Sequence, residues 1–447
     1  MSEKLNSSEA KRRRFRPYPK YKDSGVEWLG KIPVNWEIEN AKRLFREVVD
    51  RNHPDEPLLS VTQANGVLPR EESEIRVWNP SDDVTGYKLV LPEDFVISLR
   101  SFQGGLEYSG CRGIISPAYT VLRRRVHLDS GYFRFFLKSH QVISALNALT
   151  TGIRQGKNIS YEDFSKLPSL MPIPNEQRAI AFFLDRETAK IDTLIEKNER
   201  LIELLKEKRT VLITQAVTKG LDPTVSMKDS GVEWIGEIPE HWEVKRVKHA
   251  TNKIGSGKTP NGGAEVYVQE GVMLIRSQNV HFAGLRLDDV AFIDSNTDAE
   301  MAGSRVREED VLLNITGASL GRCCVACLEG KAANVNQHVC IIRPNQSQFE
   351  PTFLAATIAS RVVQDQIFNT ENGISRDALN FDQIGDLFLV RPPIHEQYSI
   401  AAFLDKEMAK IDALVAKVRE AIDRLKEYRI ALISAAVTGK IDIRTES

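Results

Sequence analysis

The sequence predicts two mixed α/β modules separated by two long antiparallel coiled-coil helices, with the two halves of the chain related by an internal repeat. Three observations predict this architecture. A phrase of twelve residues occurs twice with ten identical positions, as KDSGVEWLGKIP at 22–33 and KDSGVEWIGEIP at 228–239. A longer segment, 172–222, aligns without a gap with 392–442. The intervening segments, module one (46–170) and module two (252–390), have diverged much further.

The composition fits a globular protein with a heavily charged helical part. The chain has 447 residues, 42% of them apolar and 27% charged, which is enough for two or three domains. No apolar run approaches the ~20 residues of a membrane span, and no signal-peptide pattern opens the chain, so we expect a cytoplasmic protein without membrane contact. The net charge of −1 does not indicate a nucleic-acid partner, although a DNA-binding protein can keep its positive charge local.

The order of the repeats divides the chain into six segments. We expect a disordered basic tail at 1–20, a first domain at 21–171, a central helix at 172–222, a second domain at 223–391, a C-terminal helix at 392–442 and a tail at 443–447.

Both modules have mixed α/β patterns. In module one, 87–91, 94–100 and 118–124 resemble strands, and 132–149 resembles one amphipathic helix. In module two, strands are expected at 271–280, 310–315, 323–328 and 338–344, followed by one helix at 351–368. A weak pattern is shared, in which a Glu-Asp turn precedes an apolar strand and a polar, glycine-containing loop. The predicted modules are therefore equivalent in fold and different in surface.

The repeated phrase lacks a plausible catalytic set and is nearly constant while the modules differ. Its Asp-Ser-Gly reads as a turn. We expect Trp28, Trp36, Trp234 and Trp242 to be buried anchors beside the long helices. The phrase is thus interpreted as the mount of each module.

The long repeated segments carry an apolar seam at heptad spacing. The first copy gives Leu184, Ile191, Asn198, Leu205 and Leu212, with Thr188, Ile195, Ile202, Arg209 and Ala216 as the second line; the other copy gives Leu404, Ile411, Val418, Leu425 and Leu432, with Met408, Val415, Ile422, Arg429 and Ala436. A Glu-Gln pair after a proline-containing loop marks each start, and Gly220 and Gly439 mark the ends. Two such helices can pair with each other in antiparallel fashion.

Catalytic signatures are missing. IGSGKTP at 254–260 imitates a phosphate-binding loop, but Asn252 stands where that motif requires glycine. No adenine-methyltransferase loop, nuclease pattern or helicase motif is present. Cys324 and Cys327 could form half of a zinc site, but no second ligand pair completes it, which favours a buried strand with free thiols. We therefore predict no catalytic residue and no metal site.

Polar residues in the loops between strands have side chains suited to DNA. Asn and Gln pair with adenine, and Arg pairs with guanine, in the major groove. The candidates for DNA binding in module one are Arg100, Ser101, Gln103, Ser116, Tyr119, Arg154 and Lys157, with Arg123–Arg125 nearby. Those in module two are Lys258, Arg276, Ser277, Gln278, Asn279, Thr316, Ser319, Asn334, Asn336, Gln337 and Arg376. Polar loops are also normal on any protein surface, so each residue alone is a weak indication.

The order phrase, module and helix, occurring twice, resembles the specificity subunit of type I restriction–modification enzymes. The resemblance covers about residues 21–442 and is carried by YKDSGVEWLGKIPVNWE, KDSGVEWIGEIPEHWEV, ITGASLGR and the PIPNEQ and PPIHEQ helix starts. Module one departs from this pattern, with SFQGGLEYSG in place of the G-x-S-L-G string.

The resemblance implies a non-catalytic subunit whose two target-recognition domains each read half of a bipartite, asymmetric sequence in double-stranded DNA. The helices would set the distance between the halves. Two methylation subunits would modify adenine at N6, and restriction (translocation) subunits would complete the nuclease. S-adenosylmethionine, ATP and Mg²⁺ would be bound by those partners, and this chain would bind no cofactor.

Two other classes of function remain open. A coiled-coil scaffold or adaptor with protein-binding α/β heads would show no sequence-specific retention of DNA. A self-sufficient methyltransferase would transfer methyl groups without a partner, and the missing motif disfavours it.

Overall fold

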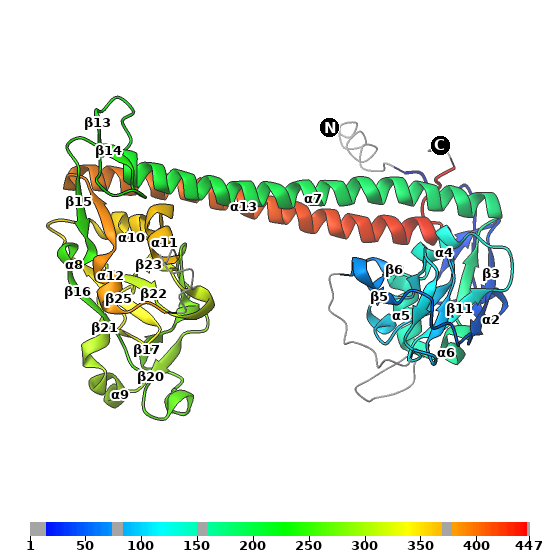
Figure 1. Ribbon diagram of the computed structural model, residues 1–447. Coiled ribbons are helices and arrows are strands. Elements are labelled where there is room, and N and C mark those ends of the chain that lie inside the picture. Colours follow the sequence, from blue (N-terminus) through cyan, green and yellow to red (C-terminus); the bar gives the residue numbers. More distant parts are fainter. Residues whose placement is uncertain (1–14, 74–83, 150–158, 369–377, 445–447) are drawn as a thin grey trace, which may run out of the picture. The chain divides into compact units, whose positions relative to one another are not determined.

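The computed structural model describes residues 15–73, 84–149, 159–368 and 378–444. The chain forms two compact units (Figure 1). Unit 1 combines the residues up to Asn198 with those from Glu420 onward, and unit 2 contains Glu199–Arg419. Each unit therefore holds one module, one copy of the phrase and parts of both long helices.

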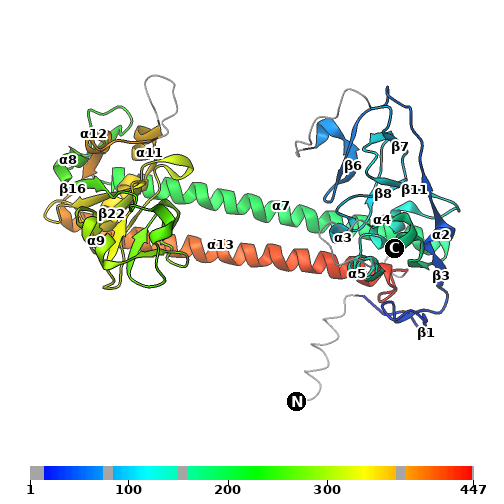
Figure 2. The ribbon, with the colours of Figure 1, turned by 90° about the horizontal axis from the view of Figure 1, so that it is seen from below.

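The two long helices are present as the heptad pattern predicts. Helix α7 spans Pro174–Lys219 and helix α13 spans Ile394–Val437. Within unit 1 the first half of α7 packs on the last half of α13, and within unit 2 the remaining halves pack together, so the helices run antiparallel in each unit (Figures 1 and 2). Gly220 and Gly439 follow the helix ends with φ of 78° and 67°, a left-handed conformation that favours glycine.

The predicted seam is the buried side of these helices. Leu184, Ile191 and Ile202 are buried, whereas Leu194 and Val211, outside the seam, are 47% and 61% exposed. An inter-helix ion pair is present in each unit. Arg429 Nε donates to Asp192 Oδ1 at 2.9 Å in unit 1, and Arg209 pairs with Asp412 in unit 2. The two pairs use equivalent positions of the two helical repeats.

Module one contains a four-stranded antiparallel sheet of order β4-β11-β8-β9. Its strands are β4 (Phe45–Val48), β11 (Thr120–Arg124), β8 (Phe95–Ile97) and β9 (Glu107–Tyr108). Beside it lie the pairs β7 (Lys88–Val90) with β10 (Gly113–Ile115) and β5 (Leu59–Thr62) with β6 (Gly66–Pro69). The helical elements are α2 (Ala41–Leu44), η1 (Arg70–Glu72), α3 (Ser101–Gly104), α4 (Ser130–Phe136), α5 (His140–Leu149) and α6 (Tyr161–Ser165).

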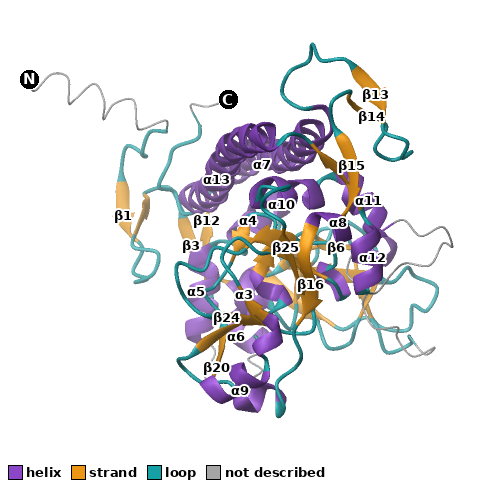
Figure 3. Cartoon of the chain, turned by 90° about the vertical axis from the view of Figure 1, so that its left-hand side faces the viewer, coloured by secondary structure: helices purple, strands orange, loops and turns teal. Residues whose placement is uncertain are grey.

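Module two repeats this sheet as β16-β25-β22-β23, of which β16 and β25 are labelled in Figure 3. The strands are β16 (Thr251–Ser256), β25 (Val339–Pro344), β22 (Val311–Asn314) and β23 (Cys323–Val325). A second sheet contains β20 (Ala291–Ile293), β17 (Val272–Ile275), β24 (Ala333–Val335) and β21 (Arg305–Val306), and β18 (Val280–His281) pairs with β19 (Gly284–Leu285). The helical elements are α8 (Val247–Ala250), η2 (Gly263–Val266), η3 (Ser277–Asn279), α9 (Ser295–Glu300), η4 (Ala302–Ser304), η5 (Gly317–Ser319), α10 (Pro351–Ala359), α11 (Arg361–Phe368) and α12 (Phe381–Asp386).

Each module is joined to its helices through the repeated phrase. In unit 1 the phrase forms β1 (Tyr21–Asp23) and β2 (Lys31–Pro33), followed by β3 (Glu37–Asn40), which pairs with β12 (Pro168–Met171). Unit 2 has β13 (Met227–Asp229) with β14 (Glu237–Pro239), and β15 (Glu243–Arg246) with β26 (Phe388–Arg391). The strand after each phrase therefore closes on the strand that leads into a long helix.

The shared strand order confirms that the modules have equivalent folds. The predicted Glu-Asp turns precede β8 and β22, with Glu93 and Glu309 at φ of 71° and 66°. The single helices expected at 132–149 and 351–368 are wrong, because each is two helices. The breaks lie at Ser139 and Ser360, which are buried and donate their hydroxyls to Phe136 O and Thr357 O.

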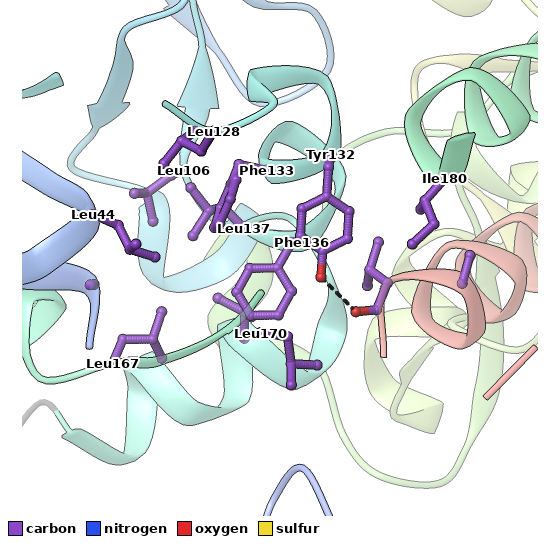
Figure 4. Packing of buried hydrophobic residues seen from close by; sticks show 14 of the residues in the cluster. Leu44, Leu106, Leu128, Tyr132, Phe133, Phe136, Leu137, Leu167, Leu170 and Ile180 are labelled. Carbon is purple, nitrogen blue, oxygen red and sulfur yellow. Dashed lines mark hydrogen bonds between the residues drawn. The ribbon is translucent and has the colours of Figure 1, made fainter. Parts of the chain in front are cut away.

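A large aromatic cluster forms the core of unit 1 (Figure 4). Tyr132, Phe133 and Phe136 are fully buried, and the Tyr132 hydroxyl donates to Val437 O at 3.0 Å. This hydrogen bond ties α4 to the last residue of α13. The core of unit 2 is built in the same way from β22, β25, α10, α11 and the ends of the long helices.

The tryptophans within the phrase and just after it differ in burial. Trp36 and Trp242 are fully buried, as predicted, and pack against Gly439 and Gly220 at the helix ends. Trp28 is half-buried on the unit 1 core. The prediction that Trp234 is buried is wrong, since it is 49% exposed. Only Trp36 and Trp242, three residues beyond each copy of the phrase, are fully buried anchors.

Candidate nucleic-acid interface

Two polar loops of module two leave the sheet at the same edge. Strands β17 and β24 run parallel and pair Ile275 with Val335, so the residues after both strands lie together. Arg276–Asn279 follow β17 and Asn336–His338 follow β24. The Asn336 amide donates to Ile275 O at 3.2 Å, which joins the two loops directly.

Two further loops meet them at this edge. Asn314, at the end of β22, donates from Nδ2 to Ser277 O at 2.8 Å, and the Ile315 amide donates to His338 O at 3.0 Å. The Gly257 amide, after β16, donates to Asn336 O at 3.2 Å. We call 256–258, 276–279, 314–319 and 336–338 the four edge loops. They are the predicted loops of module two, now brought together.

Gly257 explains the phosphate-loop-like string. A Cβ at this position would lie 1.6 Å from Val335 O, so no other residue fits without moving the backbone. The glycine of IGSGKTP therefore serves a close approach between two strand ends within the protein. Lys258, the next residue, is exposed at the same edge.

Three of the predicted contact residues point into the protein. The Asn279 side chain is buried, accepts from Arg276 N and donates to Arg286 O, and these two hydrogen bonds hold the loop that follows β17. Asn334 is buried and donates to Asp298 Oδ1 at 3.0 Å and Met301 O at 3.1 Å. Ser101 of module one is 1% exposed and accepts from Ser98 N. These side chains hold loops in place.

The other described candidates of module two reach the surface in full or in part. Gln278 and Gln337 are exposed, while Ser277, Thr316, Ser319 and Asn336 are half-buried. The Arg276 guanidinium donates to Asp289 O at 3.0 Å and lies 5.7 Å from the Tyr267 ring centroid. Its Nε is buried and has no hydrogen-bond partner among the described residues. Sequence patterns did not indicate His338 as more than a neighbour, although it contacts both Thr316 and Gln337.

Module one brings its candidate loops together at the matching edge. Thr120, which starts β11, pairs with Ile97, which ends β8, so the loops 98–104 and 116–119 are adjacent. Arg100 and Gln103 are exposed there, and Ser116 and Tyr119 are half-buried. Gln63, which no sequence pattern indicated, is exposed in the turn between β5 and β6 and donates to Arg100 O at 3.1 Å.

The side chains of Arg123, Arg124 and Arg125 form contacts within the protein. Arg123 holds Asp94 through Nε and Nη2, at 2.9 and 2.7 Å, and this pairing raises the pKa of Arg123. Arg124 pairs with Glu93, and Arg125 donates to Phe45 O. These arginines lie near the candidate loops because they stabilise the structure of module one.

A buried carboxyl lies behind the loops of module one. Glu107, in β9, is fully buried, and burial raises its pKa to about 7, while the neighbouring Lys138 ammonium acts in the opposite direction. Lys138 also donates to Gln63 O at 2.7 Å. The ion pair thus connects the sheet to the β5–β6 turn.

The candidates Arg154, Lys157 and Arg376 lie outside the described residues. Described residues next to these segments adjoin the loops. Asn147 donates to Phe102 O at 2.7 Å in module one, and Leu379 donates to Ile315 O at 2.9 Å in module two. Ala378 also forms an isolated bridge with Thr316.

The described residues contain no group of three or more histidines, cysteines and carboxylates that could hold a metal ion. Cys323 and Cys324 are buried in β23, as the strand interpretation predicts, and Cys327 is exposed. Among the helices described, none is long and apolar enough to cross a bilayer.

Comparisons with known proteins give a consistent set of relatives. No family model matches the chain. It is 24% identical over 365 residues to the type I restriction enzyme EcoBI specificity subunit of Escherichia coli, covering 79% of this chain and 74% of that protein. It is 22% identical to the MjaVIII specificity subunit of Methanocaldococcus jannaschii, covering 93% and 95%, and 20% identical to the EcoKI specificity subunit of Escherichia coli K12, covering 92% and 90%.

Solved structures share the fold. A chain from a study of complex assembly and conformational transition in the type I R-M system matches with a TM-score of 0.63 at 16% identity, covering 92% of this chain and 99% of that one. The HsdS subunit of Thermoanaerobacter tengcongensis matches with a TM-score of 0.52 at 15% identity, covering 92% and 98%. Two modules with two long packed helices are therefore an architecture found in other proteins.

Proposed function

We propose, from the premise that this chain is the specificity subunit of a type I restriction–modification enzyme, that each module reads one half of a bipartite, asymmetric DNA target. The chain is a non-catalytic subunit of that system and directs DNA recognition. One observation carries the finer proposal. Two sheets of the same strand order present polar loops at matching strand ends, and these loops differ in sequence. Two such readers select two different half-sites.

The exposed and half-buried loop residues are the proposed DNA contacts. In module two these are Lys258, Arg276, Ser277, Gln278, Thr316, Ser319, Asn336 and Gln337; in module one they are Arg100, Gln103, Ser116 and Tyr119. Arg154, Lys157 and Arg376 remain candidates from the sequence. We assign Ser101, Asn279 and Asn334 to positioning these loops, since their polar atoms are hydrogen-bonded inside the protein. Amide and guanidinium groups in such loops suit the edges of bases in the major groove.

The proposal extends to spacing and partners. The helices α7 and α13 set the distance between half-sites, and two methylation subunits and the restriction subunits assemble on the chain. These partners bind S-adenosylmethionine, ATP and Mg²⁺ and carry out adenine N6-methylation and cleavage.

The test is genome-wide mapping of N6-methyladenine in cells that express this chain with its methylation subunit. We expect a split, asymmetric motif. Replacing 46–170 by the corresponding segment of another specificity subunit should change one half of the motif, and replacing 252–390 should change the other. A continuous motif, or a swap that alters both halves, would contradict the proposal.

Two outcomes would favour the other classes. An adaptor would leave no sequence-specific methylation or DNA retention with any methylation subunit. A self-sufficient methyltransferase would transfer label from S-adenosylmethionine to DNA when the chain is purified alone.

A further inference from the structure

We propose that His338 is a positioning residue that couples the hydrogen-bonding directions of Thr316 and Gln337, so that these two side chains read the half-site of module two as one unit. This inference rests on the proposed function. It concerns a residue that lies between two of the four edge loops and that no sequence motif marks.

The geometry links three side chains in a row. His338 Nδ1 lies 2.6 Å from Thr316 Oγ1, and its Nε2 lies 3.0 Å from Gln337 Nε2. The backbone of His338 is also held, since its amide donates to Asn336 Oδ1 at 3.1 Å and its carbonyl accepts from Ile315 N at 3.0 Å. The ring is half-buried and fixed on both sides, while Gln337 is exposed.

The chemistry of a neutral imidazole makes these contacts interdependent. One ring nitrogen donates and the other accepts. Gln337 Nε2 can only donate, so His338 Nε2 accepts from it and the ring proton is on Nδ1. That proton is donated to Thr316 Oγ1, which leaves the Thr316 hydroxyl proton available to an acceptor outside the protein.

The opposite arrangement changes both residues together. If the Gln337 amide rotates by half a turn, its Oε1 faces the ring and must accept from His338 Nε2. Nδ1 then accepts from the Thr316 hydroxyl, whose outward side becomes an acceptor. A donor on Thr316 therefore always accompanies one amide orientation of Gln337, and an acceptor accompanies the other.

This coupling bears on base recognition. A glutamine amide reads adenine through one N–H and its oxygen, and both remain available on the edge of Gln337 that faces away from His338. A hydroxyl alone fits either a donor or an acceptor on a base. Fixing its direction removes that ambiguity, and holding the glutamine in one rotamer lowers the entropy lost on binding.

The experiment uses the complete methyltransferase complex and a DNA library randomised at every position of both half-sites. The variants are His338→Ala, His338→Asn and His338→Gln, with Thr316→Val and Gln337→Ala as references. Asparagine is short enough to place its amide near the position of Nδ1, and glutamine reaches that of Nε2. His249→Ala is the matched control, because His249 is exposed on α8.

We expect His338→Ala to weaken base preference on the order of tenfold at the positions that Thr316→Val and Gln337→Ala also affect, the effect of one hydrogen-bonding side chain at a base edge. His338→Asn should restore preference at the Thr316 position, and His338→Gln at the Gln337 position. The half-site of module one and the His249→Ala variant should be unchanged.

Two results would overturn the inference. One is an unchanged motif in His338→Ala, whether or not the reference variants alter theirs. The other is a uniform loss of methylation over both half-sites in all three His338 variants, which indicates a role in folding only. Both leave the proposed function intact, because that is tested separately by the motif of the parent complex and by the module swaps.

Discussion

The Arg343 guanidinium holds the Asp310 carboxylate with two hydrogen bonds, from Nε to Oδ1 and from Nη2 to Oδ2, each of 2.7 Å. Arg123 and Asp94 form the same pair in module one. In both modules the carboxylate follows a left-handed glutamate and precedes the central strand of the sheet, and the arginine lies on the neighbouring strand. The pair thus fixes the shared turn while the loops at the opposite strand ends vary.

Breaking this pair should destabilise one module. Asp310 is 1% exposed, and Asp310→Ala leaves a largely buried arginine without its partner. Removing one partner of a buried ion pair costs about 3–5 kcal/mol. Hydrogen exchange in β22 and β25 should speed up accordingly, while β8 and β11 of module one keep their protection. Asp365→Ala, which breaks the exposed pair with Arg361, is the control and should change exchange little. Equal effects of the two variants would contradict this account.

The glutamine of each helix start explains the repeated Glu-Gln motif. Gln397 Nε2 donates to Pro392 O and Gln348 O at 2.9 and 2.8 Å, and its Oε1 accepts from Glu350 N at 2.9 Å. Gln177 makes the equivalent bonds to Pro172 O and Asp129 N in unit 1. The side chain links the start of α4 in unit 1, and of α10 in unit 2, to the start of a long helix.

Gln397→Ala should therefore destabilise unit 2 by about 2–3 kcal/mol, because buried groups left unsatisfied cost about 1–3 kcal/mol each. Hydrogen exchange of the first turn of α10 is the measurement. Tyr398→Ala, at the adjacent residue that is 59% exposed, should change it by less than about 0.5 kcal/mol. Equal hydrogen-exchange rates in Gln397→Ala and Tyr398→Ala would contradict this role of Gln397.

Repeats and periodicity predicted the architecture well, because they depend on patterns that survive divergence. The heptad seam, the helix ends and the equivalence of the modules were all recovered. The breaks at Ser139 and Ser360 were not, since apolar spacing continues through them and only a buried hydroxyl marks the turn. Residue type likewise could not separate Asn279, which faces inward, from the exposed Gln278 beside it. Which side of a loop a polar residue occupies is decided by contacts from distant strands.

The raised pKa of Glu107 predicts a pH dependence of stability in module one. Its carboxyl titrates near 4.5 when unfolded and at about 7 when folded. Between these values the folded protein keeps a proton that the unfolded chain releases, so stability falls as the pH rises from 4.5 to 7. Outside that window the contribution of Glu107 to stability does not change with pH. The total is on the order of 3 kcal/mol at 1.36 kcal/mol per pKa unit.

Glu107→Gln should remove this slope. Urea unfolding of unit 1 at pH 5 and pH 8 is the measurement, and the variant should lose less stability than the parent between the two. Glu71→Gln, at an exposed position in the same module, should retain the parent slope. If the slope persists in Glu107→Gln, another group is responsible.

Gly257→Ala should disturb the four edge loops because the new methyl group would overlap Val335 O. The backbone after β16 must then move, and with it the bond from Gly257 N to Asn336 O. We expect base preference to weaken at the half-site of module two and to remain unchanged at the half-site of module one. Gly303→Ala is the control, since a Cβ there meets no atom within 4 Å. Methylation of a randomised DNA library reports both, and an unaltered motif in Gly257→Ala would show that the loops tolerate the shift.

The two buried tryptophans that follow the phrase, Trp36 and Trp242, should respond differently to the same substitution. Trp242 Nε1 donates to Glu396 Oε2 at 3.0 Å, whereas Trp36 Nε1 has no partner among the described residues. In unit 1 the equivalent carboxylate, Glu176, accepts instead from the Tyr18 hydroxyl. Both indoles are fully buried against a helix-terminal glycine, so replacement by phenylalanine removes a similar volume in each.

The difference between Trp242→Phe and Trp36→Phe therefore reports the hydrogen bond to a carboxylate. We expect Trp242→Phe to cost about 1.5–3 kcal/mol more than Trp36→Phe. Hydrogen exchange in β14 for the first and in β2 for the second gives the two free energies, and Trp234→Phe, at an exposed site, sets the baseline. Equal costs would mean that Trp36 Nε1 finds a hydrogen-bond partner in solution. The two mounts would then be energetically equivalent, although only in unit 1 does a tyrosine, Tyr18, donate to the carboxylate.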